Sequence, residues 1–232
     1  PMKPSGIQWL GDVPQHWSVK PLKYLATFRS GGTPSKTVPA YWHGDVPWAS
    51  SKDLKTETLA DTIDHITQHA LDSDAATLVP VGSVLVVVRG MILLHTFPVV
   101  QTLAPMAINQ DLKALTPANC IHQSYLPWLL RGSTTATFSR IDEAAHGTKV
   151  IRMEAWTSIE LPVPPIEEQV EIVEAVIKRR TQIDNLLAEA ERAIELLQER
   201  RTALISAAVT GKIDVRGFCK TVAQSSKTCE YA

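Results

Sequence analysis

The chain has 232 residues, of which 44% are hydrophobic and 20% are charged, a composition typical of a folded protein rather than a disordered one. Its 23 lysines and arginines are matched by 24 acidic residues, and the balance holds both in residues 1–160 and in residues 161–232. This near-neutral charge disfavours a free-standing DNA-binding domain, which usually carries an excess of positive charge.

The sequence also indicates the cellular compartment of the protein. The longest apolar run, residues 82–88, is far shorter than the roughly 20 residues that span a bilayer, and no signal sequence opens the chain. Three cysteines (Cys120, Cys219 and Cys229) do not suggest a disulfide framework. We therefore expect a cytoplasmic protein with no membrane association.

Residues 1–161 show the pattern of a mixed α/β domain. Apolar runs broken by Gly, Pro, Asn and Asp predict strands at residues 82–89, 92–100 and 112–115. The first strand should be buried on both faces, because it contains consecutive β-branched residues. Residues 123–130 predict a short amphipathic helix with Pro127 near its start, and residues 150–159 lead back toward the C-terminal part of the chain.

Residues 162–211 have a different character, that of one long helix. No Gly or Pro occurs from residue 166 to residue 210; Pro165 suits the first helical position, and Gly211 is a natural end. At about 1.5 Å per residue, residues 165–210 predict a rod of roughly 70 Å. The polar tail, residues 212–232, is expected to be disordered.

An apolar seam runs along this predicted helix in a heptad pattern. Its positions are Val173, Arg180, Leu187, Ile194, Arg201 and Ala208, alternating with Val176, Ile183, Ala190, Leu197 and Leu204. A seam with alternate spacings of three and four residues requires a second long helix, and the chain contains no other. The pattern therefore predicts pairing with another molecule.

Two arginines interrupt the seam, and two interpretations of them stay open. Arg180 and Arg201 either fix the register and the choice of partner, or extend past the seam so that their guanidinium groups reach water.

Candidate catalytic and metal-binding residues are few. Asp61, His65 and His69 are spaced by four and would share one face if residues 59–71 were helical, but that segment is polar throughout, so we expect a solvated surface and no metal. A hydrolase could pair Asp111 or Asp142 with His122 or His146, yet no Gly-x-Ser-x-Gly turn presents a nucleophile.

The chain also lacks the usual phosphate- and cofactor-binding motifs. Neither a Walker A motif nor a dinucleotide-binding glycine motif is present, and the glycine-rich residues 31–36 suit an exposed loop. The cofactor-binding and catalytic motifs of an adenine methyltransferase are missing as well. We therefore predict a non-catalytic chain with no cofactor of its own.

In several segments, taken in order, the chain resembles the specificity (S) subunits of type I restriction–modification systems. The resemblance runs from about residue 5 to residue 217 and is carried by residues 5–11, 14–17, 29–35, 41–44, 46–48, 80–85, 89–90, 109–111, 147–149, 161–169 and 203–216. Each segment is weak alone, and the ordered set is specific.

The resemblance implies a fold and a set of partners. Such subunits carry two target-recognition domains, each followed by a spacer helix, and the two helices pack antiparallel. They bind double-stranded DNA, dock methyltransferase subunits that use S-adenosylmethionine, and in some complexes dock motor–nuclease subunits. The implied fold class here is α+β, a mixed α/β recognition domain (residues 1–161) followed by one helix that pairs as an antiparallel coiled coil with a second copy.

One recognition domain and one helix amount to half the usual subunit. This implies either a homodimer that recognises a split palindromic site or a fragment of a longer subunit. Because the methyltransferase would supply phosphate contacts, we expect the isolated chain to bind DNA weakly.

Base recognition requires polar side chains on exposed loops, which gives a set of candidates. The candidates are Thr33, Ser35, Lys36, Ser50, Ser51, Lys52, Arg89, Asn109, Gln110 and Lys149. The glycines near Lys36 would let the backbone approach the duplex.

Some candidates also have a structural alternative. Ser50 or Ser51 could cap the next helix, Arg89 could make a structural ion pair, and Asn109 could hold a turn, while Lys149 is a candidate phosphate contact. For the nearby Tyr41, Trp42 and Trp48, packing is favoured over base stacking. Two functions of other classes remain, a coiled-coil adaptor whose head binds protein and the small hydrolase.

Overall fold

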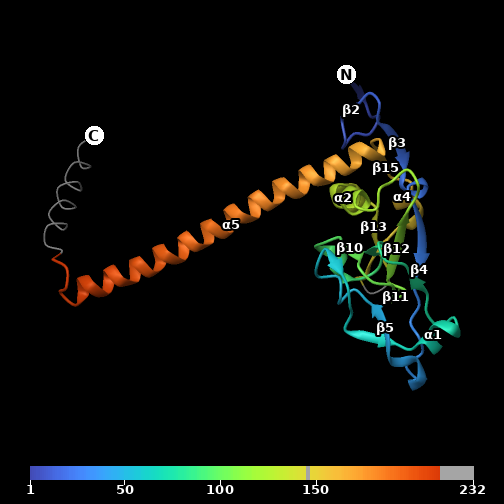
Figure 1. Cartoon of the computed structure of the whole chain (residues 1–232), viewed down its shortest axis with the longest axis horizontal. Coiled ribbons are helices and arrows are strands. Elements are labelled where there is room, and N and C mark those ends of the chain that lie inside the picture. Colours follow the sequence, from blue (N-terminus) through green and yellow to red (C-terminus); the bar gives the residue numbers. More distant parts are fainter. Residues whose placement is uncertain (145–146, 215–232) are drawn as a thin grey trace. The chain divides into compact units, whose positions relative to one another are not determined.

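The computed structural model describes residues 1–144 and 147–214, and the chain forms two compact units, Pro1–Ala175 and a second unit that begins at Val176 (Figure 1). The predicted disorder of the tail concerns residues that are mostly outside the described ranges. No helix in the described part of the chain is both long enough and apolar enough to cross a membrane.

The first unit is built around a five-stranded sheet. Its strands, in spatial order, are β4 (Ala26–Ser30), β12 (Leu112–Pro117), β9 (Val84–Val87), β10 (Val99–Thr102) and β6 (Thr58–Leu59). All neighbours are antiparallel except β10 and β6. All four residues of β9 are buried, which confirms the buried strand expected within residues 82–89. The strand predicted at residues 112–115 is also confirmed, as β12.

The strand predicted at residues 92–100 is wrong over most of its length. A 3₁₀ helix, η3 (Met91–Leu94), occupies its first part, and β10 begins only at Val99. Gly90, with φ of 146°, redirects the chain after β9, and Leu93 then packs into the core from the single helical turn. An apolar run without alternation fits a buried turn as well as a strand.

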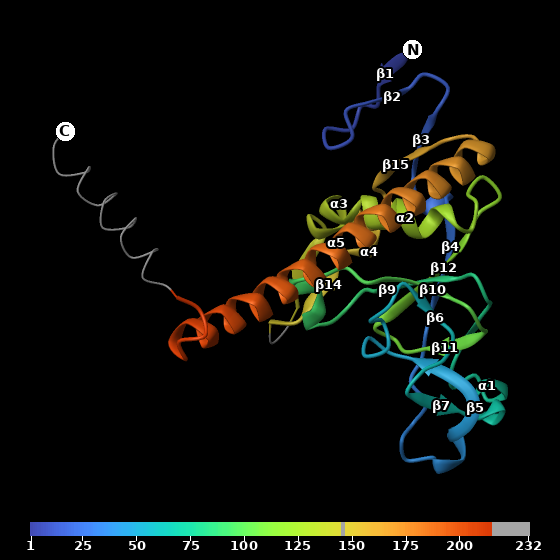
Figure 2. The ribbon, with the colours of Figure 1, turned by 60° about the vertical axis from the view of Figure 1, so that its left-hand side comes forward.

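A four-stranded sheet forms a smaller layer of the same unit, with its own core. Its order is β7 (Asp64–Ile66), β5 (Trp42–Ala49), β11 (Met106–Ile108) and β8 (Leu78–Val79). β11 is parallel to β5, while the other two pairs are antiparallel. The strands β5, β7 and β11 lie together with α1 (Gln68–Asp72) at one end of the unit (Figure 2).

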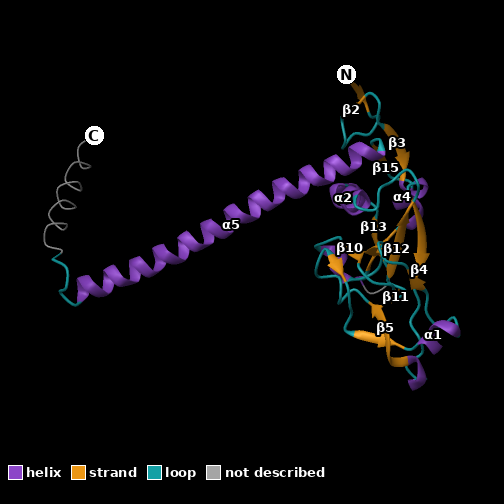
Figure 3. Ribbon diagram, in the orientation of Figure 1, coloured by secondary structure: helices purple, strands orange, loops and turns teal. Residues whose placement is uncertain are grey.

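Three two-stranded sheets and several short helices complete the unit (Figure 3). The strand pairs are β1 (Met2–Pro4) with β2 (Asp12–Pro14), β13 (Ile141–Glu143) with β14 (Lys149–Ile151), and β15 (Glu160–Val163) with β3 (Ser18–Pro21). The remaining helices are η1 (Leu22–Tyr24), η2 (Pro39–Tyr41), α2 (Tyr125–Gly132), α3 (Thr134–Phe138) and α4 (Met153–Thr157). The helix expected at residues 123–130 is confirmed as α2, with Pro127 in its first turn.

Trp156 lies at the centre of the larger core. Its side chain is fully buried, and its ring meets the rings of Phe28 and Phe97 edge-on, each with centroids 5.9 Å apart. The indole Nε1 donates a hydrogen bond of 3.0 Å to the Thr137 hydroxyl, so the polar atom of this large side chain is satisfied. α3, α4, β4 and the segment before β10 are thereby joined.

The long helix α5 (Ile166–Val209) has 44 residues, as the uninterrupted pattern predicts. Its start is shifted by one position, because the Pro165 carbonyl accepts the first helical hydrogen bond, from Gln169, and Pro165 is therefore the N-cap residue. Gly211 ends the helix with φ of 73°. There, Gly211 and Lys212 donate backbone hydrogen bonds to Ala208 and Ala207, the pattern of a Schellman motif.

The first turns of α5 belong to the first unit, where two neighbouring side chains fix them to other segments. The buried Gln169 accepts a hydrogen bond from the His122 backbone at 2.8 Å and donates two of 2.9 Å to the carbonyls of Cys120 and Pro164. Glu168 accepts a 2.8 Å hydrogen bond from Trp17 Nε1 and contacts His16 Nε2 at 2.6 Å. The hydrogen bond from Trp17, followed by the one from His16, lowers the pKa of Glu168.

From Val176 onward, α5 exposes its apolar residues. Among them are Ile183 (58% exposed), Leu187 (56%) and Leu197 (62%). Val173, which the heptad pattern also assigns to the pairing seam, is only 4% exposed and packs in the core of the first unit. Arg180 lies 3.6 Å from Asp184 on the same helix.

Candidate nucleic-acid interface

Five of the ten predicted DNA-contact residues line one cleft in the first unit, with a volume of about 580 Å³. The residues around it are Lys36, Pro39, Trp42, His43, Trp48, Ser50, Ser51, Lys52, Asp64, Asn109 and Asp111. They come from the loop after β4, from β5 and the turn that follows it, from the start of β7, and from the turn between β11 and β12. Segments far apart in the sequence therefore share one concave surface.

The loop after β4 is held in place by close packing against β11. A Cβ atom on Gly31 would lie 2.0 Å from the Ile108 carbonyl oxygen, so only glycine fits there, and Gly32 donates a 2.9 Å hydrogen bond to the same oxygen. The expectation that the glycines open the loop to a duplex is therefore wrong for Gly31, because its free face is filled by the protein's own strand.

Two tryptophans fix the same loop from the other side. Trp48 Nε1 donates to the Gly32 carbonyl at 3.0 Å, and Trp42 Nε1 donates to the Ser35 carbonyl at 3.2 Å. The two rings meet edge-on, with centroids 5.3 Å apart. These contacts support the packing role for both side chains, although both also line the cleft.

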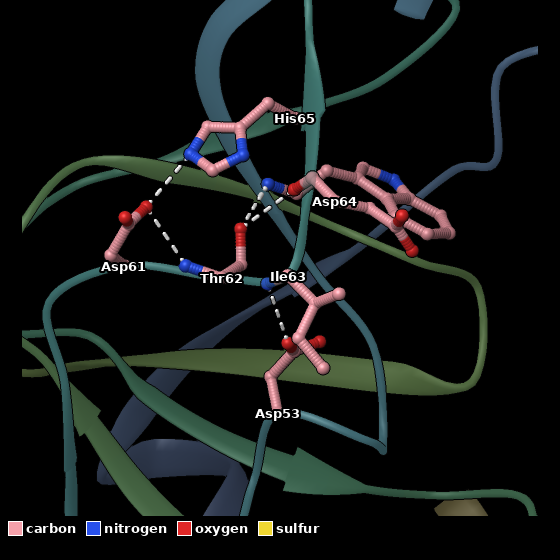
Figure 4. A network of polar contacts seen from close by, with 7 residues as sticks. Asp53, Asp61, Thr62, Ile63, Asp64 and His65 are labelled. Atoms are coloured by element: carbon pink, nitrogen blue, oxygen red, sulfur yellow. Dashed lines mark hydrogen bonds and ion pairs between the residues drawn. The ribbon is translucent and has the colours of Figure 1, made fainter. Parts of the chain in front are cut away.

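The Asp53 carboxylate closes the turn after β5 and also binds the Ile63 backbone, the contact drawn in Figure 4. Asp53 Oδ2 accepts hydrogen bonds from the Ser50 backbone (2.8 Å) and hydroxyl (2.9 Å), and Oδ1 accepts one from the Ile63 backbone (3.0 Å). The Thr62 hydroxyl, nearby, accepts from the Trp48 backbone at 2.9 Å. Ser50 thus holds a turn, as its structural alternative proposes, though the segment that follows is not a helix, while Lys52 is exposed.

The turn between β11 and β12 holds the third group of candidates. Asn109 is buried, and its Oδ1 accepts a 3.1 Å hydrogen bond from the Asp111 backbone, the turn-holding role named as its alternative. Gln110 is exposed and accepts a hydrogen bond from the Thr33 hydroxyl. Thr33, Gln110 and Ser35, whose hydroxyl contacts that of Thr37 at 2.7 Å, do not line the cleft.

Arg89 and Lys149 also lie outside the cleft, on adjoining backbone. Arg89 is exposed, and its backbone donates to the Asp111 carbonyl at 3.3 Å, so its Cα adjoins the turn that contributes Asp111 to the cleft. The Lys149 ammonium lies 2.5 Å from the Glu143 carboxylate, and this hydrogen bond lowers the pKa of Glu143. Lys149 thus has a partner within its own hairpin, β13–β14.

The arrangement of Asp61, His65 and His69 on one helical face is wrong. Asp61 lies in a loop, His65 in β7 and His69 in α1. His65 Nε2 lies 2.8 Å from Asp61 Oδ1 (Figure 4), and Asp61 has a lowered pKa because of hydrogen bonds first from the Thr62 backbone and then from His65. Within residues 1–144 and 147–214, no three His, Cys, Asp or Glu side chains are grouped to hold a metal ion.

The hydrolase candidates are likewise separated. His122 Nδ1 contacts the Ser124 hydroxyl at 2.8 Å, Asp142 pairs with Arg152 at 3.0 Å, and Asp111 lines the cleft. His146 lies outside the described residues. Nothing among the described contacts joins these groups into one nucleophilic site.

His43, Asp64 and Asp111 are the ionisable cleft residues that sequence reasoning did not select as DNA contacts. β5 bulges between Trp42 and Val46, and His43 adopts a left-handed conformation there with φ of 61°. Asp111 follows Asn109 and Gln110 in one turn, so the polar cluster itself could have pointed to it. Asp64 and His43 give no such signal, because a bulge and a long-range strand pairing bring them to the cleft.

The chain is similar to a known protein family and to two named relatives. The sequence pattern of the type I restriction modification DNA specificity domain matches residues 14–195. The EcoR124I/EcoR124II specificity subunit of Escherichia coli is 32% identical over 183 residues, covering 78% of this chain and 45% of that subunit. The MjaIX specificity subunit of Methanocaldococcus jannaschii is 24% identical over 193 residues, covering 82% and 43%. This chain thus spans less than half the length of either relative.

Two solved structures share the fold. A chain from a type I R-M system superposes with a TM-score of 0.66 at 19% identity, covering 87% of this chain and 48% of that chain. The HsdS subunit from Thermoanaerobacter tengcongensis gives 0.55 at 17% identity, covering 78% and 41%. At these identities the likeness concerns the fold alone. Because the family pattern extends over most of its sequence, from residue 14 to residue 195, this chain belongs to the type I restriction modification DNA specificity domain family.

Proposed function

We propose that this chain recognises a specific double-stranded DNA sequence as the specificity component of a type I restriction–modification complex and carries out no chemical step itself. The observation that carries the proposal is the cleft, in which four segments distant in sequence bring polar and charged side chains together beside packed tryptophans. Family membership supports it, because the two relatives are named as specificity subunits. Base edges are recognised by side chains of this kind.

The nearly neutral charge of the chain implies that other subunits hold the DNA backbone. With 23 basic and 24 acidic residues, the chain has little net attraction for phosphate. Methyltransferase subunits would supply those contacts together with S-adenosylmethionine and the methyl transfer, and motor–nuclease subunits would join the same complex for cleavage. In this assembly the chain determines which sequence is modified.

A second copy of the chain is the proposed partner of α5. Beyond Val176 the helix exposes apolar residues at successive seam positions, among them Ile183, Leu187, Ile194 and Leu204. Two such helices packed antiparallel would bury both seams and place two identical recognition domains about a twofold axis. The DNA site is then a palindrome split by a spacer.

Methylome mapping tests the proposal. The chain is co-expressed with its methyltransferase in a host without other adenine methylation, and a variant with Lys36, Ser51 and Lys52 all changed to Ala serves as comparison. We expect methylation of one split palindromic sequence by the wild type and loss or relaxation of that motif in the variant. Methylation without sequence preference contradicts the recognition role, and an asymmetric split motif contradicts the homodimer.

A further inference from the structure

The charged side chains of the cleft are of both signs, and this distinguishes two kinds of DNA contact. Lys36 and Lys52 line it together with Asp64 and Asp111. Within the described parts of the chain, none of these four side chains makes an ion pair or a hydrogen bond, so all four are available to a ligand. The other conspicuous lysine, Lys149, already has the Glu143 carboxylate as its partner.

A phosphate group does not fit this combination. It presents only negatively charged acceptors, which lysines attract and carboxylates repel, so a cleft for the DNA backbone would gain nothing from Asp64 and Asp111. A base pair in the major groove presents acceptors and a hydrogen-bond donor side by side. Lysine ammonium groups can donate hydrogen bonds to the acceptors of the base pair, and carboxylate oxygens can accept from its donor.

We propose, building on the recognition role argued above, that the cleft binds the major-groove edge of a G·C pair. A lysine ammonium from Lys36 or Lys52 donates to guanine O6 and N7, and a carboxylate from Asp64 or Asp111 accepts from the cytosine N4 amino group. An A·T pair fits less well, because thymine offers a lysine only one acceptor and its methyl group would lie against charged side chains. Guanine offers two adjacent acceptors.

The surroundings of the cleft make the carboxylates selective. Trp42, Trp48 and Pro39 form an apolar part of its wall, which excludes water from a base pair bound there. A carboxylate that loses water and finds no donor is costly, so a pair without an amino group at that position is rejected. The discrimination arises from the penalty on the wrong base as much as from the hydrogen bond to the right one.

The test uses the full chain assembled with its methyltransferase and the sequence found by methylome mapping. Binding is measured to the cognate duplex and to duplexes with each base pair changed in turn, for the wild type and for Asp64→Asn and Asp111→Asn. Asp45→Asn is the matched control, because Asp45 is an exposed carboxylate on β5, a strand that contributes other residues to the cleft, and does not itself line the cleft. We expect one of the two cleft variants to lose about tenfold or more in discrimination at a single G·C position, with none lost in the control.

Substitutions of the two cleft lysines provide a second part of the experiment. Lys36→Ala or Lys52→Ala is expected to relax recognition at the same G·C position. If Asp64→Asn and Asp111→Asn instead raise the affinity for every duplex equally, as Asp45→Asn would, the carboxylates only repel phosphate and the proposal is overturned. A half-site with no G·C pair overturns it too. An assembled wild type that binds all duplexes alike refutes the recognition role itself, which is a separate result.

Discussion

The two units of the chain differ in how far their apolar side chains are exposed. In Pro1–Ala175, large side chains such as Leu85, Ile108 and Trp156 are fully buried by the unit's own sheets and helices. In α5 beyond Val176, Ile183 and Leu197 are more than half exposed. Similar side chains therefore stabilise the first unit by themselves, whereas those of the second unit contribute only when another surface covers them.

This difference has a thermodynamic form. Burial of a leucine or isoleucine side chain contributes roughly 1.5–3 kcal/mol, and an isolated helix in water is marginal at best. The first unit obtains its burial on folding, so its stability should not depend on protein concentration. The helix obtains it on association, so its stability should.

Replacing Trp156 should have the largest effect, confined to the first unit. Trp156→Ala removes a fully buried ring that contacts Phe28 and Phe97 and leaves the buried Thr137 hydroxyl without its donor. We expect a loss of about 3–5 kcal/mol in the free energy of unfolding, measured by urea denaturation at two protein concentrations. Trp9→Ala, at a 42% exposed position, is the control and should cost far less. A similar loss in both variants would refute this account of the core.

A charged residue in the heptad seam of α5 should have the next largest effect, which is a weakening of dimer association. Leu197→Glu places one carboxylate from each copy in the proposed antiparallel interface. We expect the dissociation constant of the dimer to rise at least 100-fold, because each copy loses about 1.5–3 kcal/mol of free energy from the burial of its leucine. Sedimentation equilibrium measures this, and unfolding of the first unit should be unchanged.

Leu196→Glu is the matched control for the seam. Leu196 is 60% exposed, close to the 62% of Leu197, but lies one position away from the seam. We expect it to remain dimeric. A monomeric wild type at tens of micromolar, or equal effects of the two substitutions, would contradict the homodimer.

The smallest effect should appear in the first turn of α5, within the first unit, as a dependence of stability on pH. The pKa of Glu168 is lowered from 4.5 in the folded chain, first by the hydrogen bond from Trp17, so its carboxylate stabilises the fold above that value. This contribution is lost as the pH falls below 4.5 through the lowered pKa. Glu168→Gln should therefore be less stable than the wild type at pH 7, and the difference should shrink in acid.

Urea midpoints between pH 7 and pH 3.5 measure this convergence. Glu167→Gln, in the same first turn of α5, controls for the general effect of an acidic residue near the start of a helix. If the difference in urea midpoint between the wild type and Glu168→Gln stays constant over the whole pH range, the contact with Trp17 does not contribute to stability through ionisation of Glu168.

The parts of the fold that follow from local pattern were predictable. α5 is indicated by the absence of Gly and Pro from residue 166 to residue 210 and by Gly211 after it, and β9 by four successive aliphatic residues. The structure of residues 92–100 was not predictable, because whether an apolar segment becomes a strand or a buried turn depends on the residues that pack against it. Gly90 and the core position of Leu93 decide that here.

The candidate site was predictable only in part, for the same reason. Polar loop residues such as Lys36, Ser51 and Lys52 can be recognised in the sequence, and they do meet in one cleft. Asp64 reaches it through the pairing of β7 with β5, and His43 through a bulge in β5. Pairings between distant segments leave little trace in either segment alone, so these residues emerge only from the fold.

The Asp53 carboxylate has a consequence for how such a domain could acquire new targets. It binds the backbone amides of Ser50 and Ile63, so it holds the two ends of the intervening loop together. Within that loop Leu54 and Leu59 are buried in the core, whereas Lys55, Thr56 and Ala60 are exposed. The exposed positions can therefore be randomised in a library, with Asp53 and the two leucines retained, in a search for altered specificity.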